Sequence, residues 1–158
     1  MLEQFKTISD LSEVIKELEG MVLRPTPNWS HPTLYRRRDV SESEKLIQGV
    51  RVKDWFMSPD EKWVLPHDQM GLSFSSTYQN LKDVYKLKQR HNKSRQVNIY
   101  WILSAADIPA NLAFEADRDK KGHFFLVVTE KMHISSLVTK LKIIARRMSV
   151  IRNAEKAL

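Results

Sequence analysis

Two runs of β-branched and aromatic residues in the second half of the chain constrain its fold most. They are residues 96–103 (QVNIYWIL) and 124–128 (FFLVV), and this composition is typical of strands. Residues 117–122 (DRDKKG) lie between them and resemble a hairpin tip. Strands joined by short turns rather than by helices favour antiparallel pairing. The sequence therefore predicts an α+β fold whose sheet is mainly antiparallel or mixed, with flanking helices.

One helical pattern precedes this strand region and another follows it. Apolar residues at helical spacing over residues 134–151 predict a closing helix of about five turns. Residues 71–78 (GLSFSSTY) alternate like a half-buried strand and then lead into a helix that runs to about residue 90. Ser76 and Gln79 have the spacing of a capping box at the start of that helix.

The first half of the chain carries weaker signals. Apolar residues spaced along residues 10–20 predict a short amphipathic helix. Three prolines in residues 24–32 exclude a helix there and predict an extended surface loop. We further predict a strand over residues 33–38, a helix of about two turns over 40–49, and loop with short strand over 50–70.

Length and composition predict one globular domain. The 158 residues match the size of a single domain, so we expect one over 1–158, with the helix and proline-rich loop in 1–30 and the core in 33–150. No cysteine is present, which excludes disulfides and thiolate metal sites. No long apolar run or secretory signal is visible, so we expect a cytoplasmic protein with no membrane partner.

Positive charge is unevenly distributed along the sequence. The net charge is +7, and residues 82–95 hold six Lys and Arg while residues 131–158 hold seven. Such a field favours an anionic ligand, a nucleic acid or an acidic protein partner. The same pattern is also typical of two basic helices with solvated outer faces.

The common catalytic motifs are missing from the sequence. It contains no phosphate-binding P-loop, no glycine-rich dinucleotide motif, no zinc-protease helix and no nucleophile elbow. Its five histidines have no ligand spacing, so we predict no metal site.

Two local features remain as candidates for a binding site. Tyr35 and Arg36 end the predicted strand, where a guanidinium can bind phosphate or a ribose hydroxyl with fixed geometry. Residues 73–77 (SFSST) offer hydroxyls and helix N-terminal amides for a phosphorylated or amide-bearing ligand. Taken singly, these features are equally typical of a surface arginine and of a helix cap with spare serines.

In their order along the chain, these features resemble the ADP-ribosyltransferase-like fold over about residues 33–150, and more specifically the small bacterial toxins and effectors of that fold. The resemblance implies NAD as substrate. It implies that Arg36 binds the phosphate or ribose of NAD and that Ser73 and Ser75 support the nicotinamide pocket. It also implies that Tyr78 or Tyr35 stacks on the nicotinamide.

The resemblance also implies a catalytic carboxylate. The family's glutamate motif has no counterpart here, and Glu130 and Glu115 are the acids nearest to its place in the order. Glu130, directly after a predicted strand, would polarise a ribose hydroxyl and stabilise an oxocarbenium-like transition state. Arg36, Ser73 and Glu130 are therefore the predicted catalytic set. Phe74 stands where the family's serine motif has threonine.

Three functions are compatible with these patterns. The first is an NAD-dependent toxin or modifying enzyme that transfers ADP-ribose to a macromolecule and is inhibited by an acidic antitoxin or immunity protein. The second is a nucleic-acid-binding or ribonuclease-like protein whose basic helices contact phosphates without NAD chemistry. The third is an α+β domain without enzymatic activity whose serines only cap a helix.

Overall fold

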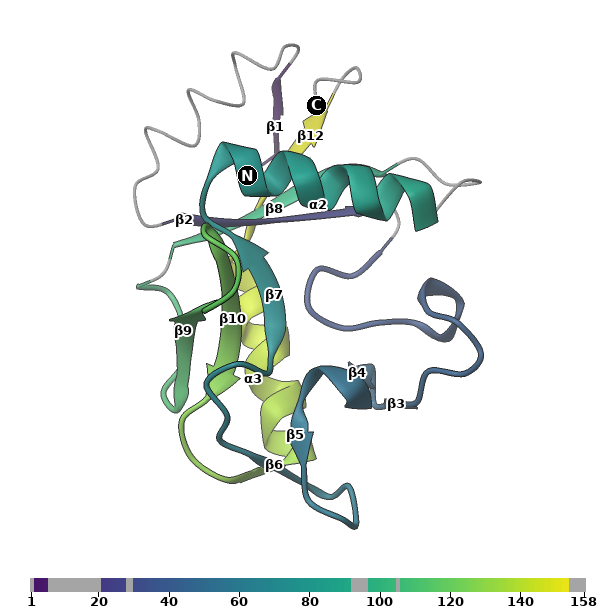
Figure 1. Ribbon diagram of the computed structural model, residues 1–158, viewed down its shortest axis with the longest axis vertical. Coiled ribbons are helices and arrows are strands. Elements are labelled where there is room, and N and C mark those ends of the chain that lie inside the picture. Colours follow the sequence, from purple (N-terminus) through teal and green to yellow (C-terminus); the bar gives the residue numbers. More distant parts are fainter. Residues whose placement is uncertain (1, 6–20, 28–29, 92–96, 105, 154–158) are drawn as a thin grey trace.

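The computed structural model describes residues 2–5, 21–27, 30–91, 97–104 and 106–153. Within them the chain forms a mixed α+β structure with mainly antiparallel sheets and two helices (Figure 1). The predicted α+β class with a mixed, mainly antiparallel sheet is confirmed. The helix predicted within residues 10–20 lies outside the described residues. No described helix has the length and apolar character needed to cross a membrane.

The main sheet has seven strands in the order β1-β12-β8-β2-β7-β10-β9. Neighbouring strands are antiparallel except for β1 and β12, which are parallel. In that order the strands are Leu2–Phe5, Ser149–Asn153, Val97–Ser104, Met21–Pro27, Leu72–Ser75, His123–Val128 and Leu112–Ala116.

Smaller elements surround the lower end of this sheet. They are a three-stranded sheet, a two-stranded hairpin and two short 3-10 helices. All but one of their elements fall between β2 and β7 in the sequence, and the remaining strand, β11, directly precedes the helix Ile134–Arg147. These elements are β5 Phe56–Met57, β6 Trp63–Leu65, β11 Met132–His133, β3 Leu46–Ile47, β4 Val50–Arg51, η1 Arg37–Asp39 and η2 Val52–Asp54.

The two helices, α2 (Tyr78–His91) and α3 (Ile134–Arg147), cover opposite faces of the main sheet (Figure 1). Leu72 and Phe74 of β7 belong to the core cluster that includes the buried face of α3. Ser75 points to the other face, where the Asn80 side chain of α2 donates a hydrogen bond to its hydroxyl at 2.6 Å. Since side chains alternate along a strand, the helices must lie on different sides.

β2 separates from β7 after one residue pair. Within the described strands, Leu23 opposite Ser75 is the single β2–β7 pair, whereas β2 follows β8 from Met21 to Pro27. Pro25 and Pro27 have no amide hydrogen, so this part of β2 cannot form complete ladders on both sides. Figure 1 shows β2 running steeply across the direction of β7. The gap between them is where the candidate site forms.

Two predicted elements in the first half are wrong. Residues 33–36 form no strand, because the amides of Thr33 and Leu34 bind the His31 ring instead of a neighbouring strand. Residues 40–49 form no helix, but a turn followed by the β3–β4 hairpin. The hairpin turn has positive φ at Gln48 (51°) and Gly49 (87°), a conformation that matches the twist of tightly joined strands.

The closing helix is shorter than predicted. α3 ends at Arg147, and residues 149–153 form β12 between β1 and β8. Ile151 continues the apolar helical spacing, but β-branched residues such as Val150 and Ile151 also fit a sheet, and two neighbouring strands are available there. The predicted strands around residues 72–75, 97–103 and 124–128, the hairpin tip at 117–122 and the helix ending near residue 90 are confirmed.

The proline-rich segment differs from prediction in one respect. Residues 24–27 are extended as expected, yet they are buried within the main sheet rather than lying on the surface. The segment pairs with β8, and Trp101 Nε1 of that strand donates to the Thr26 hydroxyl at 2.9 Å. This places Arg24 in the interior.

Candidate functional site

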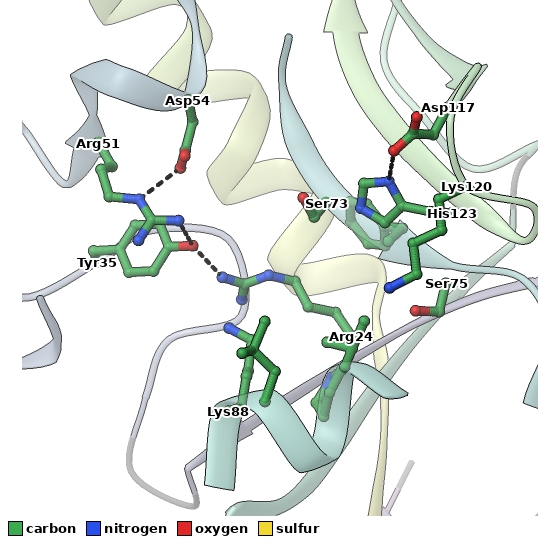
Figure 2. Close-up of a pocket in the computed structure, with 14 residues that line it drawn as sticks. Arg24, Tyr35, Arg51, Asp54, Ser73, Ser75, Lys88, Asp117, Lys120 and His123 are labelled. Carbon is green, nitrogen blue, oxygen red and sulfur yellow. Dashed lines mark hydrogen bonds and ion pairs between the residues drawn. The ribbon is translucent and has the colours of Figure 1, made fainter. Parts of the chain in front are cut away.

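A pocket of about 280 Å³ lies in the gap between β2 and β7 (Figure 2). Its wall combines five parts of the described chain: β2, β7, the loops and η2 around residues 35–54, α2, and the β9–β10 hairpin. Its polar lining consists of four cationic side chains, two carboxylates, three hydroxyls and one imidazole. These are Arg24, Arg51, Lys88, Lys120, Asp54, Asp117, Tyr35, Ser73, Ser75 and His123.

Arg24 is the buried charge of this pocket, with 4% of its surface exposed. Its guanidinium donates to the Pro32 carbonyl oxygen and, through Nη2, to the Tyr35 hydroxyl at 2.7 Å. No carboxylate in the described part of the chain forms an ion pair with it. A buried charge is normally compensated by an opposite charge, so Arg24 gives the pocket a surplus of positive charge.

Tyr35 lies between two arginines. The Arg51 guanidinium carbon is 4.6 Å from its ring centroid and the Arg24 carbon is 5.3 Å away. Arg51 Nη2 also donates to the Tyr35 hydroxyl, at 3.2 Å, and Arg51 Nε donates to Asp54 at 2.9 Å. A phenol has two lone pairs and one proton. Because both arginines donate to Tyr35, its own O–H proton remains for an acceptor on a ligand.

The environment of the pocket lowers the pKa of the Lys88 amine. Burial, together with the nearby Arg24 and Arg51 charges, lowers the pKa of Lys88 to about 7, despite the opposing effect of Asp54. For Arg51, burial alone would lower the pKa, but Tyr35, Asp54 and Glu44 raise it, so its guanidinium stays charged. The pocket therefore holds two fixed guanidinium charges and an amine near its titration point.

The serines of β7 have two different roles. Ser75 is 1% exposed and its hydroxyl holds the Asn80 side chain, which fixes α2 on the sheet. Ser73 is exposed at the pocket wall. The helix cap is supplied by Thr77, whose hydroxyl accepts a hydrogen bond from the backbone N–H of Asn80 at 3.2 Å, rather than by the predicted capping box of Ser76 with Gln79. In this stretch Thr77 caps the helix, Ser75 acts as a clamp that holds α2 on the sheet, and Ser73 forms part of the pocket wall.

An acid–imidazole pair lies beside these serines in the pocket wall. Asp117 Oδ2 lies 2.8 Å from Nδ1 of His123, with side-chain exposures of 15% and 11%. The Asp119 amide donates to Asp117 Oδ1 at 2.8 Å. Burial would raise the pKa of Asp117, but the hydrogen bonds from Asp119 and His123 outweigh it and hold that pKa below its usual value. Asp117 is therefore ionised near neutral pH.

The structure brings together some of the predicted site residues. Tyr35, Ser73 and Ser75 line the pocket. Arg36 does not: it lines a separate, open hollow of about 530 Å³ with His31 and Trp101, and its Nε binds Asp39 at 3.2 Å. Tyr35 is common to both hollows. The backbone of Tyr78 starts α2, but its side chain lies outside the described part of the structure.

Glu130 lies away from the pocket. It is exposed in the turn after β10, whereas His123 at the other end of this strand lines the pocket. At about 3.3 Å per residue, the strand separates the two by roughly 20 Å. Glu115 is exposed in β9, opposite Phe125. Arg36, Ser73 and Glu130 therefore do not line one pocket, and the carboxylates that do are Asp54 and Asp117.

Sequence reasoning missed most of the charged residues of the site. One feature of the sequence points to Arg24: it directly precedes Pro25, and a proline predicts an interruption at the edge of a strand. Asp117 is the first residue of the predicted hairpin tip and His123 directly follows the tip, which places both near its base but does not fix the register that pairs them. In the part of the chain that the structure describes, no group of three or more His, Asp or Glu side chains could hold a metal ion.

The two basic helices, α2 and α3, do not form one surface. α2 and α3 lie on opposite faces of the sheet, and α2 directs Lys88 into the pocket. On α3, Lys140 donates to the Ala110 carbonyl and Arg147 to the Asp107 carbonyl. Part of this charge therefore binds the protein's own loops.

Comparison of this chain with protein-family models, with curated proteins and with solved structures found no match.

Proposed function

We propose that the pocket binds the phosphates of a nucleotide, and that the protein is an ADP-ribosyltransferase-like toxin or modifying enzyme that uses NAD as its substrate. The observation that carries the proposal is the buried Arg24 guanidinium, which faces the pocket and has no carboxylate partner among the residues that the structure describes. A bound phosphate would supply the missing negative charge. Guanidinium groups are suited to this role because they present several donors in a rigid plane.

Neighbouring groups would complete the phosphate site. Lys88 and Lys120 are within reach of an anion in the pocket, and the Tyr35 hydroxyl proton is free to donate. In this proposal Arg24, on the early strand β2, takes the role that the resemblance assigned to Arg36. It stands beside the serine-bearing β7, and Ser73 and Ser75 keep their assignment on the nicotinamide side.

Pocket size is relevant to which part of NAD is buried. A volume of about 280 Å³ is close to the lower end of the range for small-molecule sites. It suits one phosphorylated nucleoside half better than a whole dinucleotide, so the remainder would extend past the exposed Ser73 to solvent. In the proposed reaction the acceptor is a macromolecule, and an acidic inhibitor would complement the positively charged pocket mouth.

Binding and turnover test this function separately. ADP-ribose binding is measured by calorimetry, and nicotinamide release from NAD by chromatography. Arg24→Met should weaken ADP-ribose binding about 10- to 100-fold, the loss expected for a hydrogen bond to a charged group. Arg36→Ala should leave it unchanged. If Arg36→Ala abolishes binding while Arg24→Met does not, the assignment is wrong.

Substitutions at two neighbouring lysines give a second test that does not depend on whether the Arg24 variant folds. Lys120 lines the pocket and its neighbour Lys121 does not, and both are exposed. Lys120→Ala should weaken ADP-ribose binding about two- to fivefold, as expected for an exposed ion pair, and Lys121→Ala should not. Equal effects of the two substitutions, or no binding by the unmodified protein, would contradict the proposed phosphate site.

A further inference from the structure

His123 differs from the other histidines whose side chains the structure describes. In His31, His67 and His133, Nδ1 accepts a backbone amide two or three residues later, at 3.0–3.2 Å. A nitrogen that accepts a hydrogen bond carries no proton, so the neutral form of each of these rings has its proton on Nε2. Their unprotonated nitrogen is turned to the backbone and unavailable to a ligand.

His123 has the reverse arrangement. Its Nδ1 faces the Asp117 carboxylate at 2.8 Å, and because an ionised carboxylate can only accept, Nδ1 must donate. The neutral His123 ring therefore carries its proton on Nδ1 and leaves the lone pair on Nε2. Figure 2 shows this second ring nitrogen directed into the pocket, on the side of Ser73.

The surrounding contacts hold this ring in one orientation. His123 lies opposite Ser75 in the β7–β10 register, so it shares the pocket face of the sheet with the serines. Its ring contacts Phe125 edge-on, with centroids 4.8 Å apart. The Asp117 amide donates to the His123 carbonyl at 2.9 Å, which closes the hairpin around the pair. The backbone pairing positions the residue, and the contacts of the ring with Asp117 and Phe125 orient Nε2.

We propose that Nε2 of His123 is the general base of this pocket and that Asp117 is its positioning residue. The inference rests on the proposed use of NAD. In the step, the oxygen of water or of an acceptor hydroxyl forms a bond to C1′ of the nicotinamide ribose. The bond from C1′ to the pyridinium nitrogen breaks and its electron pair neutralises the nicotinamide. The proton of the attacking oxygen moves to Nε2 and then to solvent.

Several charged groups share the pocket with His123. They are Asp117 and Lys120 from the hairpin, Lys88 from α2, Arg24 from β2, and Arg51, Asp54 and Tyr35 from the loops. The base acts only when the imidazole is neutral and Nε2 carries its lone pair.

The first test reads the proton position directly and requires no ligand. Nitrogen-15 NMR of the whole protein at pH 8.5 distinguishes the two neutral forms of each histidine. We expect the Nδ1–H form for His123 and the Nε2–H form for His31, His67 and His133. Asp117→Asn should convert His123 to the Nε2–H form, because the new amide would donate to Nδ1. An Nε2–H form of His123 in the unmodified protein would overturn the proposal.

The second test measures turnover with the same substitution at two histidines. His123→Asn keeps a donor for Asp117 but removes Nε2, whereas His133→Asn keeps a cap acceptor for α3. His123→Asn should lower kcat for nicotinamide release by about 10²- to 10⁴-fold, with ADP-ribose affinity within twofold. His133→Asn should change neither.

The two proposals fail in different ways. If the unmodified protein does not bind ADP-ribose, the proposed function fails, whatever the NMR shows. If it binds ADP-ribose and releases nicotinamide, and His123→Asn does so at the same rate, the general base is refuted while the nucleotide pocket stands.

Discussion

The low pKa of Lys88 predicts that ligand binding takes up a proton. In the free protein this pKa is about 7 instead of 10.5, which corresponds to about 5 kcal/mol of lost stabilisation of the ammonium form. The cause is burial next to Arg24 and Arg51. A phosphate between these groups would offset their repulsion and raise the pKa again. Binding should therefore favour the protonated amine.

The proton uptake and the change in Kd follow if the pKa of Lys88 returns fully to 10.5 on binding. At pH 8 the free amine is mostly neutral and the bound amine charged, so binding would take up about 0.9 proton. Between pH 7 and pH 9 the apparent Kd would rise by about 50-fold. ADP-ribose is a suitable probe, because its pyrophosphate does not titrate in this range.

Calorimetry in buffers of different ionisation enthalpy measures the proton uptake. Lys88→Met should abolish both the uptake at pH 8 and the rise in Kd, whereas Lys86→Met, on the exposed side of the same helix, should retain them. A pH-independent Kd in the unmodified protein, together with clear binding, would refute the reasoning. The same pH dependence in Lys88→Met would assign the proton to another group.

Two further predictions concern stability, measured by urea denaturation. Ser75→Ala should cost about 1–3 kcal/mol, because it leaves the buried Asn80 amide without its partner, while Ser76→Ala should cost less than about 0.5 kcal/mol; equal costs would contradict the clamp role of Ser75. Gly71→Ala should be far more damaging than either, since its Cβ would come within 1.9 Å of the Leu126 carbonyl oxygen; a variant of normal stability would exclude this close approach of β7 and β10.

Patterns within short stretches of sequence correctly predicted the elements that depend mainly on residues near them in the chain. The alternation in residues 72–75, the helix that follows and the hairpin at 117–122 all agree with the structure. The helix predicted over 40–49 failed for a tertiary reason. Ser41 and Glu44 have capping-box spacing, but the Glu44 carboxylate binds Lys53 at 2.5 Å and Arg51 at 3.4 Å. Those partners become neighbours only after the β3–β4 hairpin has formed.

The site was only partly predictable. Ser73 and Ser75 were found because the hydroxyl-rich stretch is visible in the sequence, and Tyr35 lines the pocket although the predicted strand from which it was chosen does not form. Arg24 could not be assigned, because its burial depends on where β2 leaves β7. Asp117 and His123 needed the register of the hairpin, which spacing alone does not fix. Arg36 was chosen from a predicted strand that does not form.

The order of strands in the main sheet has a consequence for biosynthesis. β1 joins the sheet through β12, which lies between β1 and β8. At a synthesis rate of about 5–20 residues per second, the nascent β1 waits roughly 7 to 30 s for this partner. Once β8 (Val97–Ser104) has been synthesised, its edge is open to pairing with any extended chain for roughly 2 to 9 s, until β12 (Ser149–Asn153) follows. Protection of this edge on the ribosome would then govern the yield of folded protein.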